Sequence, residues 1–343
     1  MYLQTRIVSS LEKVFCSDRL DAASIDRISL LRGETGAFQI ACRSEERCKV
    51  QCQIRSRDGG PELSVRQVGL APSLLPAMPD DPYIITSEPG LFPDPLLPGD
   101  TLVAVRGKWN AFWVTAAIPP EAEPGEYELE ITLFCSHSPS PWPPPPRREF
   151  RLRFTVEILP AVLAPQRLKN TIWFHADCIQ TYYGAKCWSK RHWTLLENYM
   201  RNLAGHGGNM LYTPLWSAPL DTLPGTERPT VQLLRVRVEK GKYQFDFSRL
   251  EQWIRLAQSC GFRWFEFSHA FTQWGAAFTP KIVVETPDGE EKQFGWHVAA
   301  DSPEYRKFLT ALLPELAARL EQLGVKRQCY FHVSDEPAPE QLG

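Results

Sequence analysis

The stretch Cys329-Tyr-Phe-His-Val-Ser-Asp-Glu-Pro337 decides how we interpret the fold. It begins with apolar residues and no turn former, which is typical of a buried strand. It ends in two adjacent carboxylates, Asp335 and Glu336, and then Pro337, which cannot donate a hydrogen bond to a sheet ladder and therefore ends the strand. Two acids at the carboxyl end of a parallel strand stand where an α/β barrel carries its catalytic residues.

Upstream of this stretch, apolar segments and amphipathic helical segments alternate. We expect four strands, at 169–176, at 210–215, at 263–268 and in the opening stretch 329–337, where the proline ends the strand. Ser189, Ser248 and Ser302 are expected to cap the helices between them. Long loops follow the strands and no glycine-rich turn follows the first one, which favours a barrel over a doubly wound sheet. Because only four strands are present, the sequence predicts the first half of a (β/α)₈ TIM-type barrel, with the C-terminal half absent.

Residues 1–160 show a different pattern, the two-residue period of half-buried strands. Apolar and polar residues alternate from Phe150 to Ile158, for example. Several such strands with turn signals between them, and no helical period, predict an all-β sandwich. The Pro-containing segment 160–165 marks the boundary. We therefore predict an N-terminal β-sandwich domain over 1–160 and a partial catalytic barrel domain over 161–343.

Composition excludes some classes of partner. The net charge of -2 and the pI of about 6.4 favour neither nucleic acid nor an anionic membrane surface. The sequence has no apolar run long enough to span a bilayer and no recognisable signal peptide. Nine scattered cysteines, an odd number, indicate reduced thiols. These features predict a cytoplasmic protein, and nothing in the sequence calls for a cofactor.

A barrel would bring the carboxyl ends of its strands together, and the residues found there are those of a glycosidase. Acids serve proton transfer, histidines contact sugar hydroxyls and tryptophan stacks on a sugar ring. Asp335 and Glu336 are the candidate catalytic residues. The candidate substrate-binding residues are His175, Asp177, Thr213, His269, Trp274 and His332. We expect no metal site among them.

Several motifs together resemble those of glycoside hydrolase family 123, the β-N-acetylgalactosaminidases. They are Phe-Pro-Asp-Pro-Leu-Leu-Pro at 92–98, Pro-Gly-Glu-Tyr at 124–127, Trp-Phe-His-Ala-Asp at 173–177, Phe-Asp-Phe-Ser at 245–248 and Asp-Glu-Pro at 335–337. The resemblance covers the whole chain but only the first part of that family's catalytic barrel. It implies that Glu336 is the general acid and base. It also implies that Asp335 orients the acetamido group of the substrate.

The adjacency of the two acids supports this division of work independently. Neighbouring Cα atoms lie about 3.8 Å apart, so both side chains approach the substrate from one strand. A conventional retaining pair stands about 5 Å apart on opposite sides of the anomeric carbon. We therefore predict substrate-assisted, retaining hydrolysis of an N-acetyl-β-hexosaminide, with an oligosaccharide or glycoconjugate as substrate and galactosamine preferred by resemblance.

Two alternatives remain open on the sequence alone. One is a conventional retaining glycosidase with Glu336 as the acid and its nucleophile in the missing half of the barrel. The other is an inactive, carbohydrate-binding relative that keeps the sandwich and the aromatic residues. Because half a barrel is expected to be missing, this chain by itself is predicted to be inactive.

Overall fold

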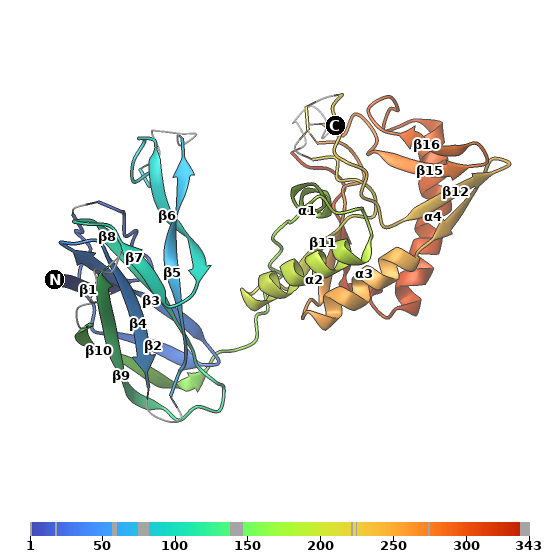
Figure 1. The fold of residues 1–343 in the computed structure, drawn as a ribbon. Coiled ribbons are helices and arrows are strands. Elements are labelled where there is room, and N and C mark those ends of the chain that lie inside the picture. The colour runs from blue at the N-terminus through green and yellow to red at the C-terminus, as the bar shows by residue number, and fades with distance from the viewer. Residues whose placement is uncertain are drawn as a thin grey trace. The chain divides into compact units, whose positions relative to one another are not determined.

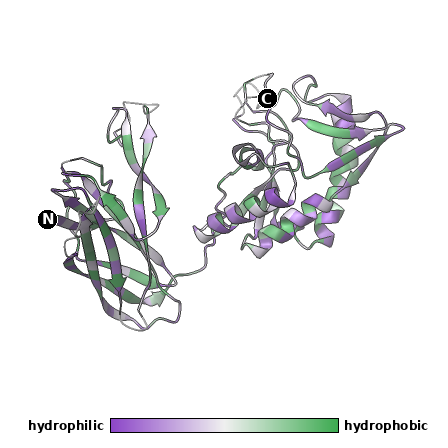
Figure 2. Ribbon diagram, viewed as in Figure 1, coloured by the Kyte–Doolittle hydropathy of each residue, from purple (hydrophilic) through white to green (hydrophobic). Residues whose placement is uncertain are grey.

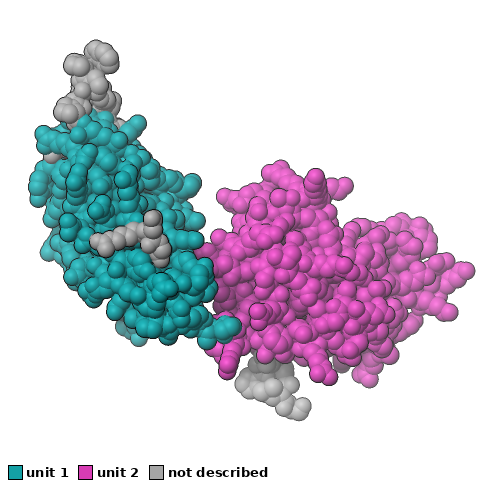
Figure 3. Space-filling view, turned by 90° about the horizontal axis from the view of Figure 1, so that it is seen from below, with its two compact units in different colours: residues 1–165 teal, residues 166–343 magenta. Residues whose placement is uncertain are grey.

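The chain divides into two compact units, Met1–Pro165 and Gln166–Gly343 (Figures 1 and 3). The structure, a computed structural model, describes residues 2–17, 19–56, 60–74, 82–137, 147–220, 222–223, 225–273 and 275–336. Each unit has a hydrophobic core of its own.

The first unit consists of two five-stranded sheets. One sheet has the order β1 (Leu3–Ser9), β3 (Thr35–Ser44), β8 (Trp109–Ala117), β5 (Glu62–Ser73) and β6 (Gly90–Pro98). The other has the order β2 (Arg27–Arg32), β10 (Arg148–Val162), β9 (Gly125–His137), β4 (Cys48–Arg55) and β7 (Thr101–Ala104). Strands β2 and β10 pair in parallel, and the other pairs are antiparallel.

The two sheets share one core, built by alternation along the strands. In β10, Phe154, Val156 and Ile158 are buried while the residues between them are half-buried. The ring of Phe154 stacks at 4.1 Å on that of Phe38, which belongs to the other sheet. Figure 2 shows the matching alternation of apolar and polar positions in these strands. The two-residue period therefore fixes which face of each sheet is buried.

The second unit is centred on a three-stranded parallel sheet with the order β11 (Met210–Thr213), β14 (Trp264–Phe267) and β17 (Cys329–Phe331). Its described residues also form the helices α1 (Ala176–Tyr183), α2 (Lys190–Gly205), α3 (Ser248–Ser259) and α4 (Pro303–Gln322), and the short 3₁₀ helix Lys326–Gln328. A separate four-stranded sheet has the order β13 (Lys242–Asp246), β12 (Arg235–Glu239), β15 (Ile282–Thr286) and β16 (Gly289–Phe294). Within it, β12 with β13 and β15 with β16 are antiparallel pairs (Figure 1).

Two of the three predicted helix caps are confirmed. The hydroxyl oxygens of Ser189 and Ser302 each accept a hydrogen bond from the backbone of the first helical turn, at 3.3 Å. The prediction for Ser248 was wrong, because α3 begins at Ser248 itself. There the carboxylate of Asp246 accepts the Ser248 backbone N–H at 2.8 Å. An aspartate two residues upstream supplies the missing acceptor in place of a serine.

The predicted fold class, an N-terminal all-β sandwich followed by the first half of a (β/α)₈ barrel, is wrong. The first expected barrel strand does not form, because residues 169–176 make a single bridge, Thr171 with Met210, and α1 then begins. The expected loop after β14 contains the hairpin of β15 and β16, which turns at Pro287-Asp288. The described chain has more strand than helix, in several sheets, where a barrel would alternate strands and helices evenly.

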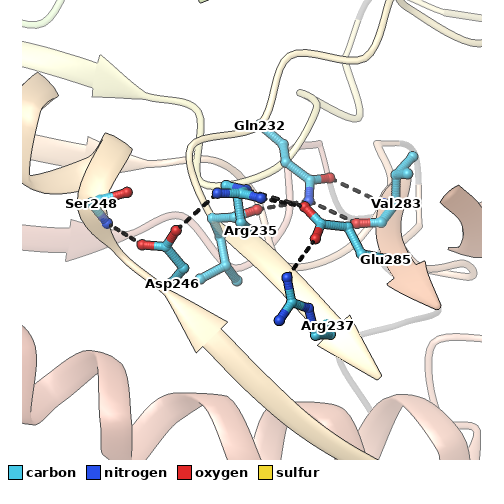
Figure 4. A network of polar contacts seen from close by, with 8 residues as sticks. Gln232, Arg235, Arg237, Asp246, Ser248, Val283 and Glu285 are labelled. Atoms are coloured by element: carbon cyan, nitrogen blue, oxygen red, sulfur yellow. Dashed lines mark hydrogen bonds and ion pairs between the residues drawn. The ribbon is translucent and has the colours of Figure 1, made fainter. Parts of the chain in front are cut away.

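Polar contacts hold the four-stranded sheet together where its ladder is weakest, since β12 and β15 share a single pair, Arg237 with Glu285. The Arg235 guanidinium contacts Asp246 at 3.2 Å and Glu285 at 2.8 Å (Figure 4). The Gln232 side chain donates to the backbone of Val283 at 2.8 Å and accepts from it at 3.0 Å. These contacts join the two hairpins. No helix in the described part of the chain is long and apolar enough to cross a membrane.

Candidate functional site

The carboxyl ends of β14 and β17 bring two predicted site residues, His269 and His332, side by side. Beyond the named strands, the two segments stay hydrogen-bonded to each other, because Ala270 N–H donates to the His332 carbonyl and Phe271 N–H donates to the Val333 carbonyl, both at 3.1 Å. The Trp216 indole N–H also donates to the His269 carbonyl at 2.7 Å. The imidazole centroids lie 4.0 Å apart. Strand pairing therefore fixes both histidines at one edge of the sheet.

A buried glutamate, Glu266 of β14, holds three segments of the chain together behind these histidines. One carboxylate oxygen lies 3.1 Å from His332 Nδ1. The other accepts the Thr171 hydroxyl at 2.8 Å and the Trp173 indole N–H at 2.9 Å. Its charge is thus shared among hydrogen-bond donors, as a buried carboxylate requires.

Aromatic side chains form one wall of the cluster. The ring of Trp173 lies 5.4 Å from His269, 6.0 Å from His332 and 5.5 Å from Tyr212 of β11, measured between centroids. His175 stands at the N-cap of α1, and its ring lies 5.4 Å from that of Tyr212. The structure therefore places the predicted His175 beside the same group of rings.

The two candidate catalytic acids lie directly after this cluster. The side-chain amide of Gln273 donates to Asp335 Oδ2 at 3.1 Å and to Glu336 Oε2 at 3.2 Å. Asp335 is half-buried and Glu336 is exposed. The backbone of Glu336 has φ of 48°, in the left-handed region that non-glycine residues rarely adopt. One amide therefore holds both carboxylates, and a strained backbone of this kind often accompanies functional sites.

The burial of His269 changes its protonation behaviour. Its side chain is completely buried, and neither ring nitrogen has a hydrogen-bond partner among the described residues. Burial first, and the neighbouring His332 second, lower the pKa of His269 to about 4. The imidazole is therefore neutral near pH 7, with a lone pair on one nitrogen. Donor atoms of His269, His332 and Asp335 lie within 4.8 Å of one another, so these three side chains could hold a metal ion.

Other predicted site residues are engaged elsewhere. The Asp177 carboxylate forms a two-pronged pair with Arg228, at 2.9 and 3.3 Å, and both side chains are nearly buried. Thr213 is buried at the end of β11, and its hydroxyl donates to the Leu211 carbonyl at 3.1 Å. Trp274 lies outside the described residues.

Sequence reasoning did not select four residues that shape this site: Trp173, Tyr212, Glu266 and Gln273. A usable signal existed for Glu266, which is the one acid in the apolar strand Trp264-Phe-Glu-Phe267. A lone carboxylate at such a position must find buried partners. The other three had no comparable signal, because their roles depend on side chains distant in the chain.

Residues 173–342 match the catalytic-domain model of glycoside hydrolase 123. The match contains each residue of the cluster except Thr171. The sequence-based resemblance is thus confirmed for this part of the chain.

Solved structures add a shared fold. A family 123 glycoside hydrolase from Clostridium perfringens, studied for glycolipid glycan hydrolysis, is similar over 100% of this chain and 60% of that one, with 16% identity and a TM-score of 0.74. This chain therefore spans 60% of the length of that glycoside hydrolase 123 enzyme.

Weaker similarities involve parts of the chain only. A cohesin from Pseudobacteroides cellulosolvens matches at 10% identity, over 50% of this chain and 99% of that one, with a TM-score of 0.22. The CooA pilin subunit of enterotoxigenic Escherichia coli matches at 9% identity, over 46% of this chain and 99% of that one, with a TM-score of 0.22. Scores this low support no conclusion. None of the curated proteins compared with the chain is similar to it.

Proposed function

We propose that the protein releases terminal N-acetyl-β-hexosamine, with N-acetylgalactosamine preferred, by substrate-assisted retaining hydrolysis. The observation that carries this proposal is the placement of Asp335 and Glu336. They are adjacent in the chain, and one Gln273 amide contacts both carboxylates. Two carboxylates on one side of a substrate suit two tasks on one edge of a sugar, whereas a conventional pair must flank the anomeric carbon.

In the proposed first step, Glu336 donates a proton to the glycosidic oxygen as the bond from that oxygen to the anomeric carbon breaks. The acetamido carbonyl oxygen of the same sugar attacks the anomeric carbon and closes a five-membered ring. Asp335 accepts the acetamido N–H and stabilises the positive charge that develops there. Holding an internal nucleophile in place is catalysis by orientation and electrostatics.

In the second step, Glu336 takes a proton from water, which attacks the anomeric carbon and opens the ring. Glu336 is then protonated again and the product keeps the original configuration. His175 and His332 are proposed to contact the sugar hydroxyls, whereas the completely buried His269 is assigned no sugar contact. We assign no sugar contact to Asp177, because Arg228 already engages its carboxylate.

The glycan is proposed to belong to a glycoconjugate. The similar enzyme from Clostridium perfringens was studied for the hydrolysis of glycolipid glycans, which supports such a substrate class. Exposure of Glu336 at the end of a strand is compatible with a large leaving group.

The proposal is tested by the response of two variants to the leaving group. General acid catalysis contributes about 10²- to 10⁴-fold, so Glu336→Gln should lose that much on a natural glycan and much less on an activated aryl glycoside. Asp335→Asn should lose activity on both the natural glycan and the activated aryl 2-acetamido glycoside, because the acetamido group that acts as the nucleophile is no longer oriented. Glu197→Gln, in an exposed helix pair, is the control.

An inhibitor separates this mechanism from a conventional retaining one. A thiazoline mimic of the cyclic intermediate should inhibit the protein and bind Asp335→Asn less tightly. Covalent labelling of a carboxylate by a 2-fluoro sugar, with an inert thiazoline, would favour the conventional mechanism. Sugar binding without hydrolysis of any 2-acetamido or plain glycoside would identify a carbohydrate-binding relative.

A further inference from the structure

The cluster at the end of β14 and β17 contains the ligand types of a transition-metal site. His269, His332 and Asp335 offer two imidazole nitrogens and a carboxylate oxygen, all within 4.8 Å of one another. Two histidines and one carboxylate are the protein ligands of several catalytic zinc sites, which leave a further position open. Magnesium and calcium instead prefer oxygen ligands throughout. The donor set therefore suits zinc and its neighbours among the divalent metals.

His269 supplies an independent observation. It is completely buried, and both of its ring nitrogens lack a hydrogen-bond partner among the described residues. A buried polar group without a partner is costly, and such groups in native proteins usually bind a water molecule or an ion, or have a function. One of these nitrogens lies within 4.8 Å of the His332 and Asp335 donor atoms. An ion bound among the three would satisfy it.

His332 is held in the manner of a metal ligand. Its Nδ1 lies 3.1 Å from the Glu266 carboxylate, so Nδ1–H donates to that carboxylate and Nε2 keeps a lone pair. Metal-binding histidines typically donate their other ring N–H to a carboxylate or carbonyl, which orients the ring. Thr171 and Trp173 hold the second Glu266 oxygen. The orienting group is therefore itself fixed.

The backbone makes the arrangement reproducible. His269 follows β14, and His332 follows β17 in the neighbouring position of the same parallel sheet. Hydrogen bonds from Ala270 to His332 and from Phe271 to Val333 fix the register of the two segments beside each other. Donors on paired strand ends need little rearrangement to receive an ion.

We propose that His269, His332 and Asp335 bind one divalent transition-metal ion, with zinc as the expected ion, and that the ion inhibits hydrolysis. Binding follows from the donor set alone. Inhibition rests on the proposed function, in which Asp335 must accept the acetamido N–H, because an Asp335 carboxylate that ligates a metal cannot orient the substrate. Zinc and substrate should therefore compete.

The test begins with metal-free protein, prepared by dialysis against a chelator and titrated with Co²⁺. Binding is measured by visible d–d absorption and by calorimetry, and zinc should displace the cobalt. We expect one equivalent to bind, without the near-ultraviolet band that thiolate ligation gives. Glu266→Gln, which removes the orienting carboxylate, should weaken binding about 10- to 100-fold.

Variants of the ligands decide the outcome. His269→Leu and His332→Gln should each lower cobalt affinity at least tenfold, whereas His206→Ala, at the exposed end of α2, should leave it unchanged. His332 is half-buried and tolerates substitution better than the buried His269. Unchanged affinity in folded His332→Gln, or failure of the unsubstituted protein to bind Co²⁺, would overturn the proposed site.

The hydrolysis assay is read separately from binding. Zinc should raise KM for an aryl N-acetyl-β-galactosaminide without lowering kcat, and a chelator should restore the original KM. Metal binding without any effect on hydrolysis would refute inhibition alone. Because residues 1–343 alone are expected to be inactive, hydrolysis is assayed on the whole protein, and its absence there would count against the proposed function. The cobalt spectra would still decide the binding site.

Discussion

Two buried carboxylates of the second unit, Asp177 and Glu266, have different surroundings. Asp177 meets the guanidinium of Arg228 in a two-pronged pair, which balances its charge. Glu266 instead meets the neutral donors of Thr171 and Trp173, and the titratable His332. Beyond His332 lies His269, buried without a hydrogen-bond partner in the described structure. A balanced pair indicates a structural role, whereas a cluster with unsatisfied hydrogen-bonding groups beside Asp335 and Glu336 indicates a functional site.

The largest effect on stability is expected from Asp177→Asn. Removing one partner of a buried ion pair leaves the other charge uncompensated and typically costs about 3–5 kcal/mol. The free energy of unfolding, measured with urea, should fall by that amount. Glu197→Gln breaks the exposed pair with Arg201 and should cost less than about 1 kcal/mol. Equal costs for the two variants would mean that the Asp177 pair is not structural.

The second prediction concerns pH and His269. Its pKa is about 4 in the folded protein and about 6.5 in an unfolded chain. Between these two pKa values the unfolded state binds more protons than the folded state. The contribution of neutral His269 to the free energy of unfolding is therefore complete above pH 6.5 and is lost as the pH falls to 4. A shift of this size corresponds to about 3 kcal/mol.

His269→Phe isolates that contribution, because an apolar ring fills the site without titrating. The variant should lose stability less steeply than the unsubstituted protein between pH 6.5 and 4, as measured by urea unfolding at each pH. Burial also lowers the pKa of His192, which acts in the same direction. His192 is present in both proteins and cancels in the difference. Parallel pH profiles would show that His269 is not the buried neutral group described above.

Glu266→Gln should have an intermediate effect on stability and a selective effect on activity. The amide cannot accept from Thr171, Trp173 and His332 as the carboxylate does, and an unsatisfied buried group costs about 1–3 kcal/mol. Misplacement of His332 and Trp173 should lower kcat roughly tenfold to 100-fold with a smaller change in KM. Unchanged kinetics in the folded variant would make Glu266 structural, like Asp177.

The smallest effect is expected on the surface of the four-stranded sheet. Glu285 contacts Arg235 and Arg237, and these exposed guanidinium groups lower the pKa of its carboxyl (Figure 4). Exposed pairs contribute little, so Glu285→Gln should cost less than about 1 kcal/mol. The cost should shrink further at 1 M salt, where charges are screened within about 3 Å. A cost that does not depend on salt would show that these contacts act by packing.

Local patterns predicted the first unit better than the second. The alternation in β10 follows directly from burial of one face, so the sequence indicates the strand without knowledge of its neighbours. In the second unit, the segment 169–176 is apolar enough for a strand, yet it makes a single bridge before α1 begins. Whether an apolar segment joins a sheet depends on the available edge, which local pattern does not contain. The turn residues Pro287-Asp288, followed by Gly289, were a readable hairpin signal that sequence reasoning missed.

In the candidate site, too, some residues could be predicted from the local sequence and others could not. His269 and His332 were expected to meet because both follow parallel strands. That expectation requires only that β14 and β17 pair, and it does not require a barrel. Trp173 and Tyr212 were not identified, since a ring's neighbours are set by the tertiary structure. Asp177 was expected to face substrate, but Arg228, 51 positions away, engages its carboxylate. Acidic residue type alone does not distinguish these two outcomes.

The partners of Glu266 are far from it in the sequence, and this affects the order in which parts of the protein fold. Its hydrogen bond to Thr171 joins residues 95 positions apart, and its contact with His332 spans 66 positions. Closing such loops costs entropy before any contact compensates for it, so distant pairings form slowly. Helices such as α4 need only local contacts and can form much earlier. During refolding, catalytic competence should therefore appear after helical circular dichroism has recovered.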